Sequence, residues 1–266
     1  MSWSSDEGRQ RVGLGAHGGA PGAMPARTQP DLLAIPGSTF VLRVEHAVRE
    51  GRCPLFDHGP RPVTIRPFGL GRTPVTNEQF AAFLEATAYQ PVEPRNFLRH
   101  WVDGNPPPDK GAHPVVWVSP RDAETYSGWA GMRLPTDEEW QWAAQGHEGR
   151  IWPWGNAFED ARCNLSAGGT TAVEQFLGGR SPYGCLDMAG NTWEWTGPEW
   201  DDGWHRWRLL RGGSYYAAQG SFWYAQGGPC PNTAHLRFLL MGEGLNRCAT
   251  VGFRCAADLQ AEENTP

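Results

Sequence analysis

The chain has 266 residues, with 23 basic and 29 acidic side chains and a formal net charge of −6. This length fits one large domain or two small ones, and without a basic run the chain lacks the charge pattern of a nucleic-acid-binding protein. No apolar stretch of 18 residues occurs, which excludes a transmembrane helix, and the N-terminus lacks the apolar core of a secretory signal. We therefore expect a cytoplasmic protein with neither a membrane nor a nucleic acid as its partner.

The composition argues against a helical bundle. There are 14 Trp, 34 Gly and 23 Pro, a mixture that favours short elements, structured loops and a core of aromatic rings. The six cysteines form no C-x-x-C pair, so a zinc site has no support. In a reducing cytoplasm, most of them are expected to be buried free thiols.

Residues 1–31 are rich in Gly, Ala, Pro and Arg and are predicted to form a flexible tail. One domain is predicted over residues 32–258, followed by a charged, frayed tail at 259–266. Strands are predicted within 35–43 and 62–68, and 69–75 is expected to be a strand or an extended loop.

Three segments carry helix-start signals, in which a hydroxyl N-cap is followed by a side chain that can reach back to it. These residues are Thr76 with Gln79, Ser119 with Pro120 and Asp122, and Thr136 with Glu139. The first helix is expected to end near Thr87 and the third at Gly146. The proline-rich segment 90–113 between the first two helices is expected to be a functional or covering loop.

Beyond the third helix the apolar periodicity fades. A central strand is predicted at 209–216, an irregular Gly-rich segment at 219–244 and a final strand at 250–256. The segment 181–195 combines turn formers such as Gly190 with two tryptophans. It is expected to be a buried loop whose carbonyl groups need partners, and a bound cation is one way to supply them.

Seven segments together resemble the formylglycine-generating enzyme family, also called sulfatase-modifying factors. They are Arg72–Phe80, His113–Val118, Arg133–Trp140, Trp152–Asn156, Asp187–Trp195, Leu210–Ser214 and Val251–Cys255. The resemblance covers roughly residues 33–258. It implies an α+β, C-type-lectin-like fold with short strands, few helices and much irregular structure.

The resemblance also implies structural calcium sites made of the hard oxygen ligands that Ca²⁺ prefers. Carried over to this chain, the first site has the carboxylates of Asp187 and Glu194 and the backbone oxygens of Met188, Gly190 and Thr192. Asn164 and Leu165 resemble part of a second site, but the acidic residue that should complete it has no clear counterpart. The alternative is that Asp187 and Asn191 only cap turns.

Catalysis in the family uses two cysteines that bind Cu(I) and activate O₂. Soft thiolates suit Cu(I), but here Ala217 and Phe222 stand where those cysteines would fall. Neither side chain can bind copper, so copper-dependent formylglycine generation is not expected of this chain. A remaining possibility is a pair formed by Cys230 with Cys248 or Cys255.

Other residues of the segment 214–237 are candidates for a reaction. Candidate catalytic residues are Ser214, Tyr216, His235 and Arg237, with Trp193, Trp223 and Tyr224 as candidate pocket walls. His235 could act as a base or a metal ligand, and Arg237 could hold an anion. A three-histidine iron site of His100, His205 and His235 has no support from spacing, and a structural role for each histidine is the simpler interpretation.

Three functions remain open. The first is an oxidoreductase-type enzyme whose redox metal is unknown and whose metal or substrate differs from that of the copper enzymes. The second is a non-catalytic C-type-lectin-like domain that binds a small molecule or peptide, as in the variable proteins of retroelements, through an aromatic surface. The third is formylglycine generation by an unusual cysteine pair.

Overall fold

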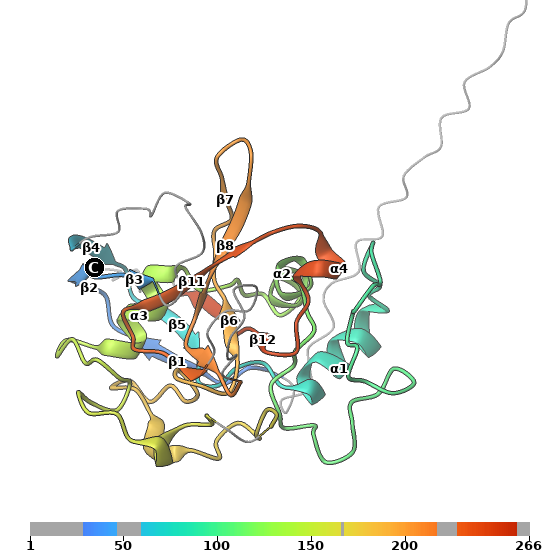
Figure 1. Ribbon diagram of the computed structural model, residues 1–266, viewed down its shortest axis with the longest axis horizontal. Coiled ribbons are helices and arrows are strands. Elements are labelled where there is room, and N and C mark those ends of the chain that lie inside the picture. Colours follow the sequence, from blue (N-terminus) through green and yellow to red (C-terminus); the bar gives the residue numbers. More distant parts are fainter. Residues whose placement is uncertain (1–28, 47–59, 166–167, 217–227, 260–266) are drawn as a thin grey trace, which may run out of the picture.

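The computed structural model describes residues 29–46, 60–165, 168–216 and 228–259, which form a mixed α+β structure (Figure 1). The helices are α1 (Asn77–Thr87), α2 (Pro120–Trp129), α3 (Asp137–Gln145) and the short α4 (Glu243–Asn246), with 3-10 turns at Asp160–Arg162 and Leu177–Gly179. Among these residues, no helix is both long and apolar enough to cross a membrane.

The three predicted helix starts are confirmed. Each of α1, α2 and α3 begins with a complete capping box, in which the N-cap hydroxyl accepts a backbone N–H bond and the N3 side chain accepts one from the N-cap backbone. The helix α1 ends at Thr87, and Gly146 follows the last residue of α3, as predicted. These helix boundaries are therefore encoded locally.

The largest sheet is built around two long neighbouring strands, β8 and β11, which pair antiparallel. Its strands, in order, are β12 (Val251–Gly252), β6 (Trp193–Trp195), β8 (Arg206–Arg211), β11 (Ala234–Leu239) and β3 (Glu45–His46), and β7 (Trp200–Asp201) pairs with β8. The hairpin of β7 and β8 projects from the body of the molecule (Figure 1).

Three smaller sheets complete the fold. They are β1 (Leu32–Ile35), β5 (Phe68–Gly71) and β13 (Ala256–Asp258); β2 (Ser38–Leu42) with β4 (Arg61–Ile65); and β9 (Gly213–Ser214) with β10 (Gly228–Pro229). In the first of these sheets, β1 and β13 lie on either side of β5.

The strand predictions for the C-terminal half are wrong in three places. The strand predicted at 209–216 stops at Arg211, because Gly212 and Gly213 have φ angles of +91° and +78° and turn the chain into β9. The strand predicted at 250–256 is divided into β12 and β13. The segment 219–244, predicted to be irregular, contains the six-residue strand β11.

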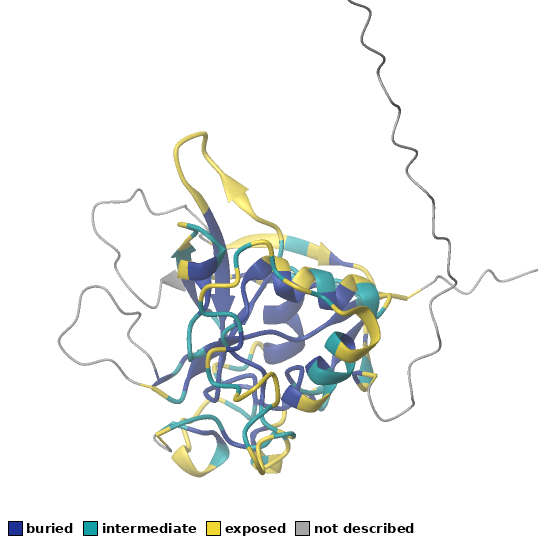
Figure 2. Ribbon diagram, turned by 90° about the vertical axis from the view of Figure 1, so that its right-hand side faces the viewer, coloured by how far each residue is buried: buried dark blue, intermediate teal, exposed yellow. Residues whose placement is uncertain are grey.

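The segment 187–195 was predicted to be a loop, but its last three residues form β6, and it contributes side chains to two apolar cores. One joins α1 and α2 to the central sheet through residues such as Phe80, Tyr126 and Trp193. The other joins α3 to the N-terminal strands through residues such as Trp140 and Phe40. The exposed β7 and the tip of the β7–β8 hairpin are distinct from the buried interior in Figure 2, whereas most of β8 is buried. Tryptophans supply much of both cores.

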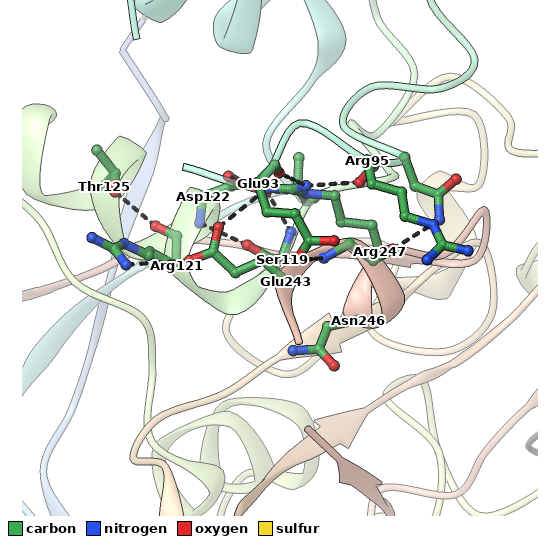
Figure 3. Close-up of polar contacts among 12 residues, drawn as sticks. Glu93, Arg95, Ser119, Arg121, Asp122, Thr125, Glu243, Asn246 and Arg247 are labelled. Atoms are coloured by element: carbon green, nitrogen blue, oxygen red, sulfur yellow. Dashed lines mark hydrogen bonds and ion pairs between the residues drawn. The ribbon is translucent and has the colours of Figure 1, made fainter. Parts of the chain in front are cut away.

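A buried ion pair fixes the predicted covering loop. Arg247 donates to both carboxylate oxygens of Asp122, at 2.7 and 3.1 Å, and also bonds the backbone carbonyls of Glu93 and Arg95 (Figure 3). Asp122 is also the N3 residue of the α2 capping box. One carboxylate therefore ties the helix start, the segment after α1 and the C-terminal α4 region together.

Candidate functional site

The side-chain amide of Asn191 fixes the loop from Asp187 to Glu194 to neighbouring segments. Asn191 accepts bonds from Asn164 Nδ2 and the Thr171 backbone N–H, and it donates to the Thr171 carbonyl. Gly190 passes so close to Asn164 that an added Cβ would lie 2.4 Å from the Asn164 carbonyl oxygen. Only glycine fits at position 190, which also has a φ of +79°.

At the end of this loop, Glu194 forms a buried ion pair. Arg254 donates to both of its carboxylate oxygens at 2.6 Å, and Trp140 Nε1 adds a third bond at 2.8 Å. The other guanidinium hydrogens of Arg254 bond the carbonyls of Gly71 and Leu186. A fully buried carboxylate is thus neutralised by a protein cation.

At the start of the loop, Asp187 is in the opposite situation. It is 6% exposed, and its Oδ2 atom has no hydrogen-bond partner among the described residues. Burial raises the pKa of Asp187 to about 7, although the nearby Arg254 lowers it. Such a carboxylate needs either a proton or a cation.

These atoms fit part of the calcium site that the resemblance implies. The unpaired oxygen of Asp187 suits a hard cation, and the hydroxyl of Thr192, buried in the same loop, has no hydrogen-bond partner within the described chain. Glu194, by contrast, already has Arg254. Met188 and Gly190 lie buried beside them, and their carbonyl oxygens stay predicted ligands.

Asn164 and Leu165 were predicted to form part of a second calcium site, and Asn164 contacts Asn191 in the loop Asp187–Glu194. The Asn164 amide donates to the Gly169 carbonyl and to the Asn191 side chain, and its backbone carbonyl accepts from the Asn191 N–H. Leu165 is half-buried beside it. The side chain of Asn164 therefore already has a structural role in positioning the first loop.

The candidate catalytic residue Ser214 is buried at the edge of β9. Its hydroxyl contacts only the backbone of Tyr216 in the described structure, and the Tyr216 side chain is 53% exposed. Cys230 lies against Gly213, where an added Cβ would be 3.1 Å from the thiol sulfur. Trp223 and Tyr224 lie outside the described residues, as do Ala217 and Phe222.

The other two candidate catalytic residues, His235 and Arg237, lie on β11, and both contact other residues of the domain. His235 is completely buried, with Nδ1 3.4 Å from Asp137 Oδ1, and Asp137 also forms a two-bond ion pair with Arg211. Arg237 stacks on Trp207, with its guanidinium carbon 3.3 Å from the ring centroid. Trp193, a candidate pocket wall, is 2% exposed inside the first core.

Metal-ligating side chains do not gather elsewhere in the part of the chain that is described. No group of three or more His, Cys, Asp and Glu residues there could hold a metal ion. His100 bonds Asn77 Oδ1, and burial lowers its pKa to about 4, whereas His205 lies on the exposed β7–β8 hairpin. The three histidines considered for iron are therefore parts of three separate environments.

The remaining thiols have separate partners. Cys230 Sγ contacts the Gly228 carbonyl, Cys248 Sγ the Asn246 carbonyl and Cys255 Sγ the Ser127 hydroxyl. Burial raises the pKa of Cys230 and Cys255 to about 12 and that of Cys248 to about 11. All three are thus thiols rather than thiolates at neutral pH.

The fold places the chain in a known structural class. PvdO from Pseudomonas aeruginosa superposes with a TM-score of 0.63 at 19% identity, over 88% of this chain and 96% of its own. CarF gives a TM-score of 0.60 at 21% identity, over 87% and 99% of the two chains. The class is the formylglycine-generating-enzyme, C-type-lectin-like fold, as the resemblance implied.

The sequence relatives then identify the family. The profile of the sulfatase-modifying factor enzyme 1-like domain matches residues 19–259, so the chain belongs to this family. The formylglycine-generating enzyme of Thermomonospora curvata is 31% identical over 90% of this chain and 97% of its own length. The protein named inactive C-alpha-formylglycine-generating enzyme 2 from Mus musculus is 33% identical over 70% of this chain and 74% of its own.

Two arginines of structural interest were missed from the sequence alone. Arg254 lies between Phe253 and Cys255, which are both fully buried. A charged residue between two core residues is a signal that a buried counter-charge must exist. Arg208, on β8, also lies between two buried residues, Trp207 and Leu209, but its carboxylate partner, Glu124, is 48% exposed.

Proposed function

We propose that this chain is an oxidoreductase-type member of the sulfatase-modifying factor family that does not generate formylglycine through a copper–cysteine centre. The cysteines carry the proposal. Ala217 and Phe222 replace the expected copper ligands, and burial raises the pKa of Cys230, Cys248 and Cys255 well above neutral pH. Since Cu(I) is held by thiolates, these protonated thiols are poor substitutes.

The substrate we propose is a small molecule or peptide other than a sulfatase cysteine. Tyr216, with its side chain 53% exposed beside Ser214, is the described candidate best placed to contact it. Ser214 and His235 are instead assigned supporting roles, because both are buried. The redox metal of such an enzyme would be bound outside the three-histidine set considered from the sequence.

Calcium is proposed as the structural cofactor of the loop Asp187–Glu194. The unpaired, buried oxygen of Asp187 supports it, and the predicted ligands are the Asp187 carboxylate and the carbonyl oxygens of Met188, Gly190 and Thr192. Glu194 would share its carboxylate between the ion and Arg254. The ion would supply positive charge that fixes the loop, with no part in a redox step.

A reducing compartment such as the cytoplasm is proposed as the location. Five cysteines in the described structure are free, and four of them are buried. Free buried thiols are typical of proteins that fold under reducing conditions.

The test combines elemental analysis of the purified full chain with O₂ consumption. We expect less than stoichiometric copper, no formylglycine on a sulfatase-type cysteine peptide, and O₂ uptake with a member of a panel of small thiols, phenols and peptides. The Cys230→Ser variant is the control and should keep that uptake. One copper per chain, or formylglycine formation that is lost in Cys230→Ser, would overturn the proposal.

A non-catalytic binding protein is the second candidate. The burial of Ser214 and His235 is compatible with it, and so are the relatives from Mus musculus and Bos taurus, whose names describe them as inactive. Calcium without a redox metal, and no O₂ uptake with any substrate of the panel, would select this candidate over the enzyme.

A further inference from the structure

We draw no further inference here: the strongest candidate, the projecting tip of the β7–β8 hairpin around the 90% exposed Trp204, carries no proposal because nothing in the described part of the chain shows what covers it.

Discussion

Two arginines on one strand, Arg211 and Arg208, meet opposite environments. Arg211 donates to both oxygens of Asp137, at 2.6 and 2.5 Å, and to the carbonyls of Asn232 and Ala234. Arg208, three positions earlier on β8, has one bond to a half-exposed glutamate and two unpaired nitrogens in the described structure. Both side chains are almost completely buried.

The difference separates an arginine whose counter-charge is buried with it from one whose carboxylate partner stays half-exposed. Arg211, Arg247 and Arg254 each have a carboxylate that accepts two bonds and carbonyl groups that accept others. Their counter-charge is built into the fold, so their removal leaves a buried anion. Arg208 lacks that arrangement, because its one carboxylate partner, Glu124, is 48% exposed.

The largest loss of stability is expected when Arg211, the fully paired arginine, is replaced. Arg211→Met should lower the free energy of unfolding by about 3–5 kcal/mol, because Asp137 is left buried without its cation. Urea unfolding followed by tryptophan fluorescence measures the loss. A change below about 1 kcal/mol, the range typical of exposed ion pairs, would contradict the structural role of this pair.

An intermediate effect is expected at Asp187, a buried carboxylate without a bound protein cation. Since its folded pKa is raised to about 7, the folded state retains a proton that the unfolded state releases above about pH 4. Stability in calcium-free buffer should therefore fall as pH rises from about 4 to 7, and by roughly 2–4 kcal/mol relative to Asp187→Asn, which lacks this titration.

Calcium should reverse the order of stability of the wild type and Asp187→Asn. At pH 7 with calcium present, the wild type should be more stable than Asp187→Asn, because the ion replaces the proton on the carboxylate. Thermal unfolding of both proteins with calcium and with EDTA is the measurement. An equal response of both proteins to calcium would place the ion away from Asp187.

The smallest effect is expected for Arg208→Met. Its partner Glu124 is 48% exposed and stays solvated when the arginine is removed, so the free energy of unfolding should change by less than about 1 kcal/mol. The same urea titration compares it directly with Arg211→Met. A loss as large as that of Arg211→Met would mean that Arg208 is also a structural ion.

The parts of the fold that were predicted from the sequence are those with local causes. Thr76, Ser119 and Thr136 start helices through bonds to residues three positions away, so a short window contains the whole signal. Strand ends in the C-terminal half depend on pairing between distant segments, and they were predicted poorly. Leu239 and Met241, for example, are apolar but 41% and 65% exposed, so their position could not be inferred from residue type.

The candidate calcium site was also predicted only in part, because it too depends on contacts between distant segments. The sequence singled out Asp187 and Glu194 together as acidic ligands of one loop, and the structure separates them. Arg254, 60 residues after Glu194, neutralises one carboxylate and leaves the other unpaired. That choice depends on tertiary packing, so no local pattern could have revealed it.

The shared strand β5 has a consequence for protein engineering. Both β1 and β13 pair antiparallel with it, so they run parallel to each other two strand spacings apart, about 10 Å. Since Asp258 lies beside Phe68 and Leu32 beside Gly71, at opposite ends of β5, a linker that joins them must return along the sheet and would need about a dozen residues. A circular permutant opened at the tip of the β7–β8 hairpin, between Gly203 and the 90% exposed Trp204, would keep every strand of the central sheet intact.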